Sequence, residues 1–254
     1  MSAGHGHLLY RHGDSLVHRL PAHAKVVALL AFVLVVVATP AERYAAFGAY
    51  AALLAGVAAL AAVPPGFMLK RMVIEVPFVA FALLLPFVAT GERVDVLGIA
   101  VSADGLLAGW NIVAKGTLGV VASILLAATT DARALLLGLQ RLRLPAKLVE
   151  IAAFMVRYAD VIVSDMQRMR VARESRAFEG RHLGHLAVVA RSAGALFIRT
   201  YERGERVHLA MLSRGYGGAM PVADAAPAGR AAWAAAAVLP LAAGAVAVTF
   251  GWLG

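Results

Sequence analysis

The sequence contains no cysteine, which excludes disulfide bonds and thiolate metal sites from this chain. Charged residues are also scarce, at 15% of 254 residues, whereas about 25% is usual for soluble domains. Acidic residues are the scarcer sign, with 15 Asp and Glu against 24 Lys and Arg, so the net charge is +9. Hydrophobic residues reach 61%, mostly in long runs of Ala, Val and Leu. These runs indicate that much of the chain is surrounded by lipid.

The common catalytic motifs are absent as well. The sequence has no HExxH, no GxSxG, no Walker A lysine and no acidic cluster suited to Mg²⁺. We therefore expect no catalytic residue, no cofactor and no metal ligand set here, and ATP hydrolysis would have to occur on another chain. A membrane enzyme stays open as an alternative class. So does a solitary channel or carrier, although the chain shows no internal repeat.

Five segments are apolar and, at roughly 20 residues, about long enough to cross a bilayer as helices. They are Ala24–Thr39, Tyr44–Val63, Met72–Thr90, Asn111–Thr130 and Ala231–Trp252. The sequence therefore predicts an all-α integral membrane protein with about five transmembrane helices. The polar N-terminus does not fit a cleavable signal peptide, so we expect the first apolar run to act as an uncleaved anchor.

Basic residues lie on alternate flanks of these segments. Arg11, Arg19 and Lys25 precede the first, and Lys70 and Arg71 precede the third. The intervening loops are balanced or acidic. Because cytoplasmic flanks retain Lys and Arg, we expect the N-terminus to be cytoplasmic and the C-terminus to lie outside. This predicts a multi-pass protein of the bacterial inner membrane, with the lipid bilayer and not nucleic acid as the partner of its positive charge.

Three ionisable residues interrupt the apolar segments, namely Lys25, Glu75 and Lys115. The topology puts Lys25 and Glu75 near the cytoplasmic ends, so it allows them to meet, and it disfavours a contact between Glu75 and Lys115. The alternative is that each side chain snorkels to the nearest interface.

Histidines gather near the N-terminus, at His5, His7, His12, His18 and His23. A cluster of this kind can bind metal. We interpret it instead as part of a solvated, partly disordered tail on the cytoplasmic side of the predicted topology.

The segment from Asp131 to Met220 differs in character from the rest, since it holds 15 of the 24 basic and 8 of the 15 acidic residues. This predicts three regions: an N-terminal transmembrane domain over 1–130, a cytoplasmic domain of long amphipathic helices over 131–220, and a C-terminal transmembrane helix over 221–254. A helix of about 30 residues is expected after Pro145, with a heptad-like apolar stripe that requires a partner helix. The stripe is Leu148, Ala152, Met155, Ala159, Ile162, Met166 and Met169.

A second amphipathic helix is expected from about Gly184 to Ser213, and the two helices are expected to form a pair that packs along their stripes against the underside of the membrane. Its rougher apolar stripe is Leu186, Val189, Ala193, Phe197 and Tyr201.

Each of these two helices ends in a similar motif. The first reads Ser175-Arg176-Ala177-Phe178 and the second Ser213-Arg214-Gly215-Tyr216, 38 positions later. An arginine flanked by small residues can enter a narrow groove and bind a carboxylate with two hydrogen bonds. The simpler alternative is that Gly215 is a helix C-cap and Arg214 favours the negative end of the helix dipole.

The two motifs resemble the paired Ala-Arg-Gly signatures of the transmembrane T component of energy-coupling-factor (ECF) transporters. Four further stretches are similar to the cobalt and nickel branch of that family, the CbiQ type. They are Ser15–Pro21 with Lys25, Ala128–Thr130 leading to Leu142–Pro145, Arg157-Tyr158, and Arg203–Val207 through Ala210–Tyr216. The resemblance covers nearly the whole chain. Ser175 and Ser213 stand where Ala is usual, and Ala177 replaces Gly.

The resemblance implies an ABC-type transporter subunit without catalysis of its own. Two ATPase subunits would dock on the signature residues, which are Ser175, Arg176, Ala177, Ser213, Arg214 and Gly215. A metal-binding membrane subunit of the CbiM or NikM type, with or without a small accessory membrane subunit, would bind cobalt or nickel. A vitamin substrate stays open as an alternative.

Overall fold

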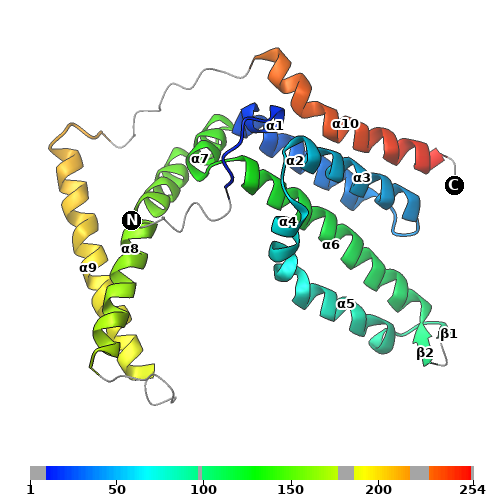
Figure 1. Ribbon diagram of the computed structural model, residues 1–254, viewed down its shortest axis with the longest axis horizontal. Helices are drawn as coiled ribbons and strands as arrows, with labels where there is room; N and C mark the ends of the chain where they lie inside the picture. The colour runs from blue at the N-terminus through cyan, green and yellow to red at the C-terminus, as the bar shows by residue number, and fades with distance from the viewer. Residues whose placement is uncertain (1–9, 97–98, 177–185, 218–228, 253–254) are drawn as a thin grey trace. The chain divides into compact units, whose positions relative to one another are not determined.

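The computed structural model describes residues 10–96, 99–176, 186–217 and 229–252 (Figure 1). Helices account for most of this part of the chain, as predicted. They are α1 (Leu16–Arg19), α2 (Ala22–Ala38), α3 (Tyr44–Leu60), α4 (Pro65–Arg71), a 3₁₀ turn η2 (Met72–Glu75), α5 (Val76–Val88), α6 (Ala103–Thr129), α7 (Ala132–Arg141), α8 (Ala146–Glu174), α9 (Leu186–Leu212) and α10 (Arg230–Trp252).

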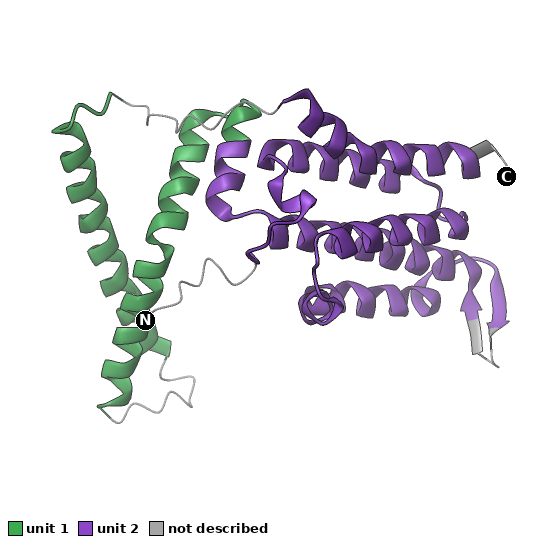
Figure 2. Cartoon of the chain, turned by 45° about the horizontal axis from the view of Figure 1, so that its top comes forward, with its two compact units in different colours: residues 1–8, 139–224 green, residues 9–138, 225–254 purple. Residues whose placement is uncertain are grey.

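The described residues form two compact units (Figure 2). Residues 10–138 and 229–252 make one, which we call the bundle unit, and residues 139–176 and 186–217 make the other, the arm unit. Helix α7 crosses from the first into the second at residue 138.

Helices α2, α3, α6 and α10 surround the core of the bundle unit. Its largest fully buried side chains include Phe32 and Tyr50. The Tyr50 hydroxyl and the Thr39 Oγ1 form a hydrogen bond of 2.9 Å, so the phenol does not leave a polar atom unsatisfied in an apolar interior.

Helices α5 and α6 approach each other closely through two glycines of α6. A Cβ atom on Gly105 would lie 2.7 Å from the Leu85 carbonyl oxygen, and one on Gly109 would lie 2.6 Å from that of Ala82. Any side chain at either position would push the helices apart. The pair is one helical turn apart, the spacing that lets membrane helices pack backbone to backbone.

Among the described residues, three helical stretches are long and apolar enough to cross a membrane, namely Pro65–Val88, Ala103–Thr129 and Arg230–Phe250. Helices α2 and α3 are apolar but shorter, at 17 residues each. The expected start of the third span at Met72 was wrong, because α4 begins at Pro65 and continues through η2 into α5. Lys70 and Arg71 therefore lie within this span and not in a loop before it.

The loop expected between the third and fourth spans contains a β-hairpin. Strands β1 (Arg93–Val96) and β2 (Ile99–Ser102) pair antiparallel, with Val94 opposite Val101. Both strands are rich in β-branched residues and only two residues separate them, which favours a hairpin over an open loop. Ser102 then caps α6 by accepting a hydrogen bond from the Gly105 N–H at 3.2 Å.

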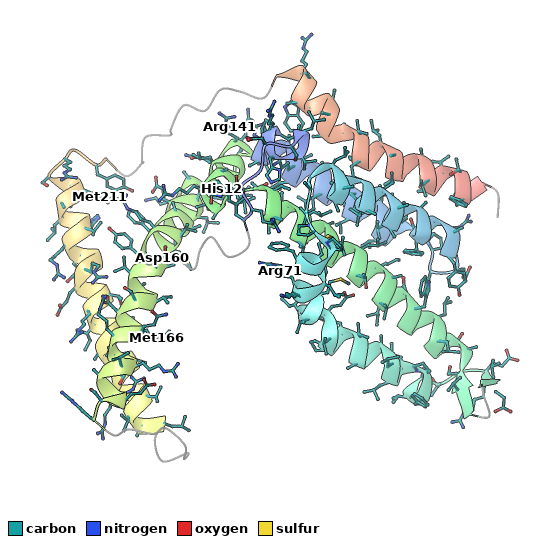
Figure 3. The ribbon with its side chains drawn as sticks, in the orientation of Figure 1. His12, Arg71, Arg141, Asp160, Met166 and Met211 are labelled. Atoms are coloured by element: carbon teal, nitrogen blue, oxygen red, sulfur yellow. The ribbon has the colours of Figure 1, made fainter. Side chains whose placement is uncertain are left out.

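In the arm unit, α8 and α9 are antiparallel, because Asp165 contacts Arg203 and the earlier Glu150 contacts the later Tyr216. The apolar stripes of the two helices do not cover each other, contrary to the expectation of a pair packed along its stripes. Leu148, Met155 and Met166 of the α8 stripe are 58%, 68% and 52% exposed, and Figure 3 labels Met166. Phe197 and Tyr201 of the α9 stripe are exposed as well.

Candidate functional site

The described part of the first Ser-Arg motif closes α8. The Ser175 N–H donates to the Val171 carbonyl at 2.9 Å, and the Arg176 N–H donates to that of Arg173 at 3.0 Å. The Ser175 hydroxyl donates back to the Ala172 carbonyl at 3.1 Å. Arg176 is exposed at the end of this tightened last turn. Ala177 and Phe178 of the expected motif lie outside the described residues.

The second motif closes α9 with the same bonds. The Ser213 N–H donates to Leu209, the Arg214 N–H to Met211, and the Ser213 hydroxyl to Ala210, each at 3.0 Å. The two helix ends therefore share one local architecture, built on the repeated sequence Ala-x-x-Ser-Arg.

Gly215 ends α9 as a C-cap, as one of the two sequence interpretations expected. Its φ of +83° is left-handed, and its N–H donates to the Leu212 carbonyl at 3.0 Å. The Tyr216 N–H donates to Met211 at 3.0 Å, which completes a Schellman motif. The cap and the exposed arginine coexist, so the two interpretations of this motif do not exclude each other.

Both arginines are exposed, and the structure gives neither guanidinium a hydrogen-bond or ion-pair partner within the described residues. Each follows the last carbonyls of a helix, where the dipole favours positive charge. Because α8 and α9 are antiparallel, Arg176 and Arg214 lie at opposite ends of the pair. The arrangement offers two similar, separate cationic ends.

Helices α8 and α9, which we call the two arms, are joined by an ion pair that the sequence did not predict. Arg203 Nη2 donates to Asp165 Oδ2 at 3.1 Å, and Arg168, one turn further along α8, donates to the other carboxylate oxygen. The hydrogen bond from Arg168, and after it the one from Arg203, lowers the pKa of Asp165 below its ordinary value. The carboxylate therefore stays charged at neutral pH.

A second hydrogen bond joins α8 and α9 near the Arg214 end. The Tyr216 hydroxyl donates to Glu150 Oε2 at 3.0 Å, and this hydrogen bond raises the pKa of the phenol. Between the arms lies an open cavity of about 630 Å³. Its lining includes Lys147, Phe154, Tyr158, Val207, Met211 and Tyr216. In the sequence, the only sign of these links is that Glu150 and Asp165 do not belong to the apolar stripe that begins at Leu148.

The three ionisable residues of the apolar segments do not pair with one another as the topology allowed. Lys25 is 7% exposed and donates to the carbonyl oxygen of Thr129 at 2.8 Å. Glu75 is 4% exposed and accepts from Thr117 Oγ1 at 2.6 Å, halfway along α6 and not near the end of a span. Lys115 donates to the Val37 carbonyl at 2.8 Å. Lys25 and Glu75 are thus buried and do not snorkel.

The expected solvated tail does not extend to the last two histidines. The His18 ring bonds the Ser15 hydroxyl at 2.7 Å, and His23, 7% exposed, packs edge-on against Trp233. His12 lies beside Tyr10 (Figure 3). His5 and His7 lie outside the described residues. Within the described part, no three His, Asp or Glu side chains are grouped to hold a metal ion.

Comparison with known proteins supports the resemblance seen in the motifs. Residues 13–222 match the family CbiQ, described as "Cobalt transport protein". Cobalt transport protein CbiQ of Rhodobacter capsulatus is 29% identical over 57% of this chain and 61% of its own length. The energy-coupling factor transporter transmembrane protein EcfT of Bacillus subtilis is 27% identical over 82% of this chain and 83% of its own.

A putative fused cobalt transport protein CbiMQ of Methanocorpusculum labreanum is 27% identical over 44% of this chain and 19% of its own length. The chain spans between 54% and 61% of the length of the first three relatives. The family match, in contrast, covers most of the chain and includes the arm unit. The chain therefore belongs to the CbiQ family of transmembrane components of energy-coupling-factor transporters.

Proposed function

We propose that this chain is the energy-coupling subunit of an ECF-type transporter that imports cobalt or nickel. Two ATPase subunits dock on the ends of the arms, one through Ser175, Arg176 and Ala177 and the other through Ser213, Arg214 and Gly215. The observation that carries the proposal is the pair of matching helix ends, each presenting an exposed arginine at an opposite end of an antiparallel pair.

The chemistry of each end suits a groove that contains a carboxylate. A guanidinium offers paired donors that match the two oxygens of a carboxylate. The neighbouring serine hydroxyl is already bonded to its own helix, so burying it in a groove leaves no donor unsatisfied. Gly215 has no side chain, and nothing else lies within 4 Å of where its Cβ would be. The helix end beside Arg214 is therefore thin enough to enter a narrow groove.

The metal itself is bound by a partner membrane subunit of the CbiM or NikM type. The names of the relatives support this, since one is a cobalt transport protein and another is a fusion named CbiMQ. A small accessory membrane subunit can complete the assembly. Hydrolysis of ATP takes place on the ATPase chains.

The N-terminus and the arm unit face the cytoplasm in this proposal, where ATP is available. The opposite end of the bundle unit carries Tyr44 and Trp110, whose rings lie 5.3 Å apart. Trp110 Nε1 also donates to the Ala41 carbonyl at 3.2 Å. Aromatic rings of this kind are enriched at membrane interfaces, which is consistent with an outer boundary there.

Nucleotide-driven closure of the ATPases would move the two arm ends, and the arms would pass this movement to the metal-binding subunit. The exposed apolar stripes of α8 and α9 supply a surface for that contact. Because the arms are joined at Asp165 and Arg203, a force on one end also acts on the other.

Charge reversal at both arm ends tests the docking. We expect the variant Arg176→Glu with Arg214→Glu to lose co-purification of co-expressed ATPase subunits, because a desolvated charge contact is worth about 2–5 kcal/mol. The membrane part should still be produced and remain monodisperse in detergent. The control is Arg191→Glu with Arg199→Glu, which makes the same charge change at two exposed positions along α9.

Three results separate the parts of the proposal. ATPase binding that survives in the arm-end variant would rule out the docking role. Equal loss in the Arg191 and Arg199 control would reduce it to a general charge effect. Uptake measured with radioactive cobalt and nickel tests the substrate: transport of neither, by a complex that still binds its ATPases, would overturn the metal assignment alone.

A further inference from the structure

The N-terminal segment is bonded to the end of α6, more than a hundred residues away in sequence. The Arg11 N–H donates to the Ala128 carbonyl at 2.9 Å. Lys25 Nζ donates to the Thr129 carbonyl at 2.8 Å, to Thr130 Oγ1 at 3.3 Å and to the His18 carbonyl at 3.3 Å. We call this network, formed by Arg11, His18, Lys25 and residues 128–130, the N-terminal joint.

Lys25 is the centre of the joint. Its side chain is buried, and the three oxygens that it contacts belong to neutral groups. Two of them are backbone carbonyls, that of His18 in α1 and that of Thr129 at the C-terminal end of α6, where the dipole of this long helix stabilises a cation. An apolar residue here would leave buried carbonyls without a donor, which is costly.

His18 fixes the other side of the joint. Its ring nitrogens lie 2.7 Å from the Ser15 hydroxyl and 3.1 Å from the Arg11 carbonyl, so the ring connects both ends of the segment from Arg11 to Ser15 to α1. The backbone carbonyl of the same residue accepts the hydrogen bond from Lys25. Ser15 also accepts from the His18 N–H at 3.3 Å and caps α1. This short segment is therefore held by its own bonds and is not a loose tail.

The joint lies where the chain leaves the bundle. Thr130 is followed by α7, whose Gly138 sits so close to α2 that a Cβ atom would lie 2.8 Å from the His23 backbone nitrogen. Helix α7 then runs to Arg141, and Pro145 starts α8 a few residues later. The last residues of the bundle unit before the arm unit begins thus contact the N-terminal segment at two successive points.

We propose that the N-terminal joint is a positioning element for energy coupling, with Lys25 as the residue that fixes the root of the arm to the bundle. The inference rests on the proposed function, in which the arms carry movement. By the root of the arm we mean the end of α6 and the start of α7, from which the arm unit continues. When these residues are held, movement of the arm unit is passed on to the bundle unit. Without Lys25 the arm can swing at α7, and ATP hydrolysis is no longer converted into movement of the metal.

The test uses the complete transporter, co-expressed with its ATPase and metal-binding subunits and reconstituted in proteoliposomes. In Lys25→Met, we expect ATPase binding and hydrolysis to persist while the cobalt imported per ATP falls at least about tenfold, the factor that loss of a charge-assisted hydrogen bond represents. Lys115→Met is the matched control, because Lys115 also donates to a carbonyl of a neighbouring helix but outside the joint.

A second readout does not depend on transport. The chain has no native cysteine, so spin labels at Ser123→Cys on α6 and Ala146→Cys on α8, both exposed, are unique. We expect the distance distribution between them to broaden in Lys25→Met and to be unchanged in Lys115→Met. Thr130→Val, which removes one acceptor, should produce a smaller change in the same direction.

The outcomes are distinguishable. An unchanged import ratio and an unchanged distance distribution in Lys25→Met overturn the joint and leave the proposed function standing. A wild-type complex that neither binds ATPases nor imports metal overturns the proposed function, while the label distances still test the joint. If Lys25→Met is not produced in the membrane, Thr130→Val decides, and wild-type values for both of its readouts overturn the inference.

Discussion

Single residues at the arm ends show how a departure from a family pattern can be neutral in chemistry. Serine replaces the usual alanine at positions 175 and 213, and each hydroxyl donates to the carbonyl three residues earlier. The substitution therefore adds no free polar group to the proposed docking surface. Gly215 is different, because its positive φ costs any other residue about 1–2 kcal/mol.

Tyr216 allows a prediction that depends on pH. Its folded-state pKa is raised because it donates to Glu150, so the stabilisation from this bond is fully present below the ordinary phenol pKa, about 10, and is lost as pH rises through the folded pKa. The phenolate absorbance of the wild type minus that of Tyr216→Phe should titrate with a midpoint above about 10. A midpoint at or below that value would contradict the bond.

At the scale of elements, apolar periodicity gave the existence of most helices but not their partners. Hydropathy located the apolar spans but not all of their starts, since the third begins at Pro65 and the fourth at Ala103, whereas the start of α8 after Pro145 was predicted correctly. The stripe of Leu148, Met155 and Met166 was not the surface that contacts α9, because Asp165 and Glu150 bond to α9 from another face. Periodicity identifies an apolar face, but it does not say which neighbour covers it.

For the candidate site, too, the sequence indicated local features but not the long-range contacts between helices. The Ser-Arg ends could be found because they repeat, and their small neighbours have a clear physical use. The ion pair at Asp165, the Tyr216 bond and the Lys25 joint each join residues 38 or more positions apart. Contacts of that separation depend on the register of packed helices, which a single sequence does not contain.

The packing of α5 on α6 leads to a stability prediction. Gly109→Leu should destabilise the bundle by about 1–3 kcal/mol, the usual cost of overpacking, because its side chain would meet the Ala82 carbonyl. Gly119→Leu on the same helix is the control, since a Cβ there meets nothing within 4 Å. Thermal stability in detergent, followed by size-exclusion chromatography, measures both. Equal melting temperatures would show that the close approach is not maintained.

At the scale of the whole molecule, the composition is explained by three different surroundings. The bundle unit presents apolar side chains such as Phe78, Leu84 and Val88, each more than half exposed, to lipid. The arm unit carries most of the net positive charge yet also exposes its own apolar stripes. In the proposed assembly these stripes contact the metal-binding subunit, and the arginines at the ends contact the ATPases.

Variants at Met166 and at its neighbour Gln167 test these two contacts separately. Met166→Glu should weaken co-purification of the metal-binding subunit roughly tenfold or more, because burial of a Met side chain contributes about 1.5–3 kcal/mol. ATPase binding should be retained, since the arm ends are unchanged. Gln167→Glu, exposed on the same helix, should affect neither partner. Loss of the ATPases in Met166→Glu would instead indicate that α8 itself had unfolded.

The ion pair between the arms has a mechanical consequence. Arg176 follows Asp165 by 11 residues, and Arg214 follows Arg203 by 11 residues, in opposite directions along an antiparallel pair. At 1.5 Å per residue, each end is roughly 16 Å from the pivot. Rotation of the helix pair about that point displaces its two ends by equal distances in opposite directions. In the proposed assembly, two ATPases that pull on these ends with equal force in opposite directions would therefore produce a pure torque about the ion pair.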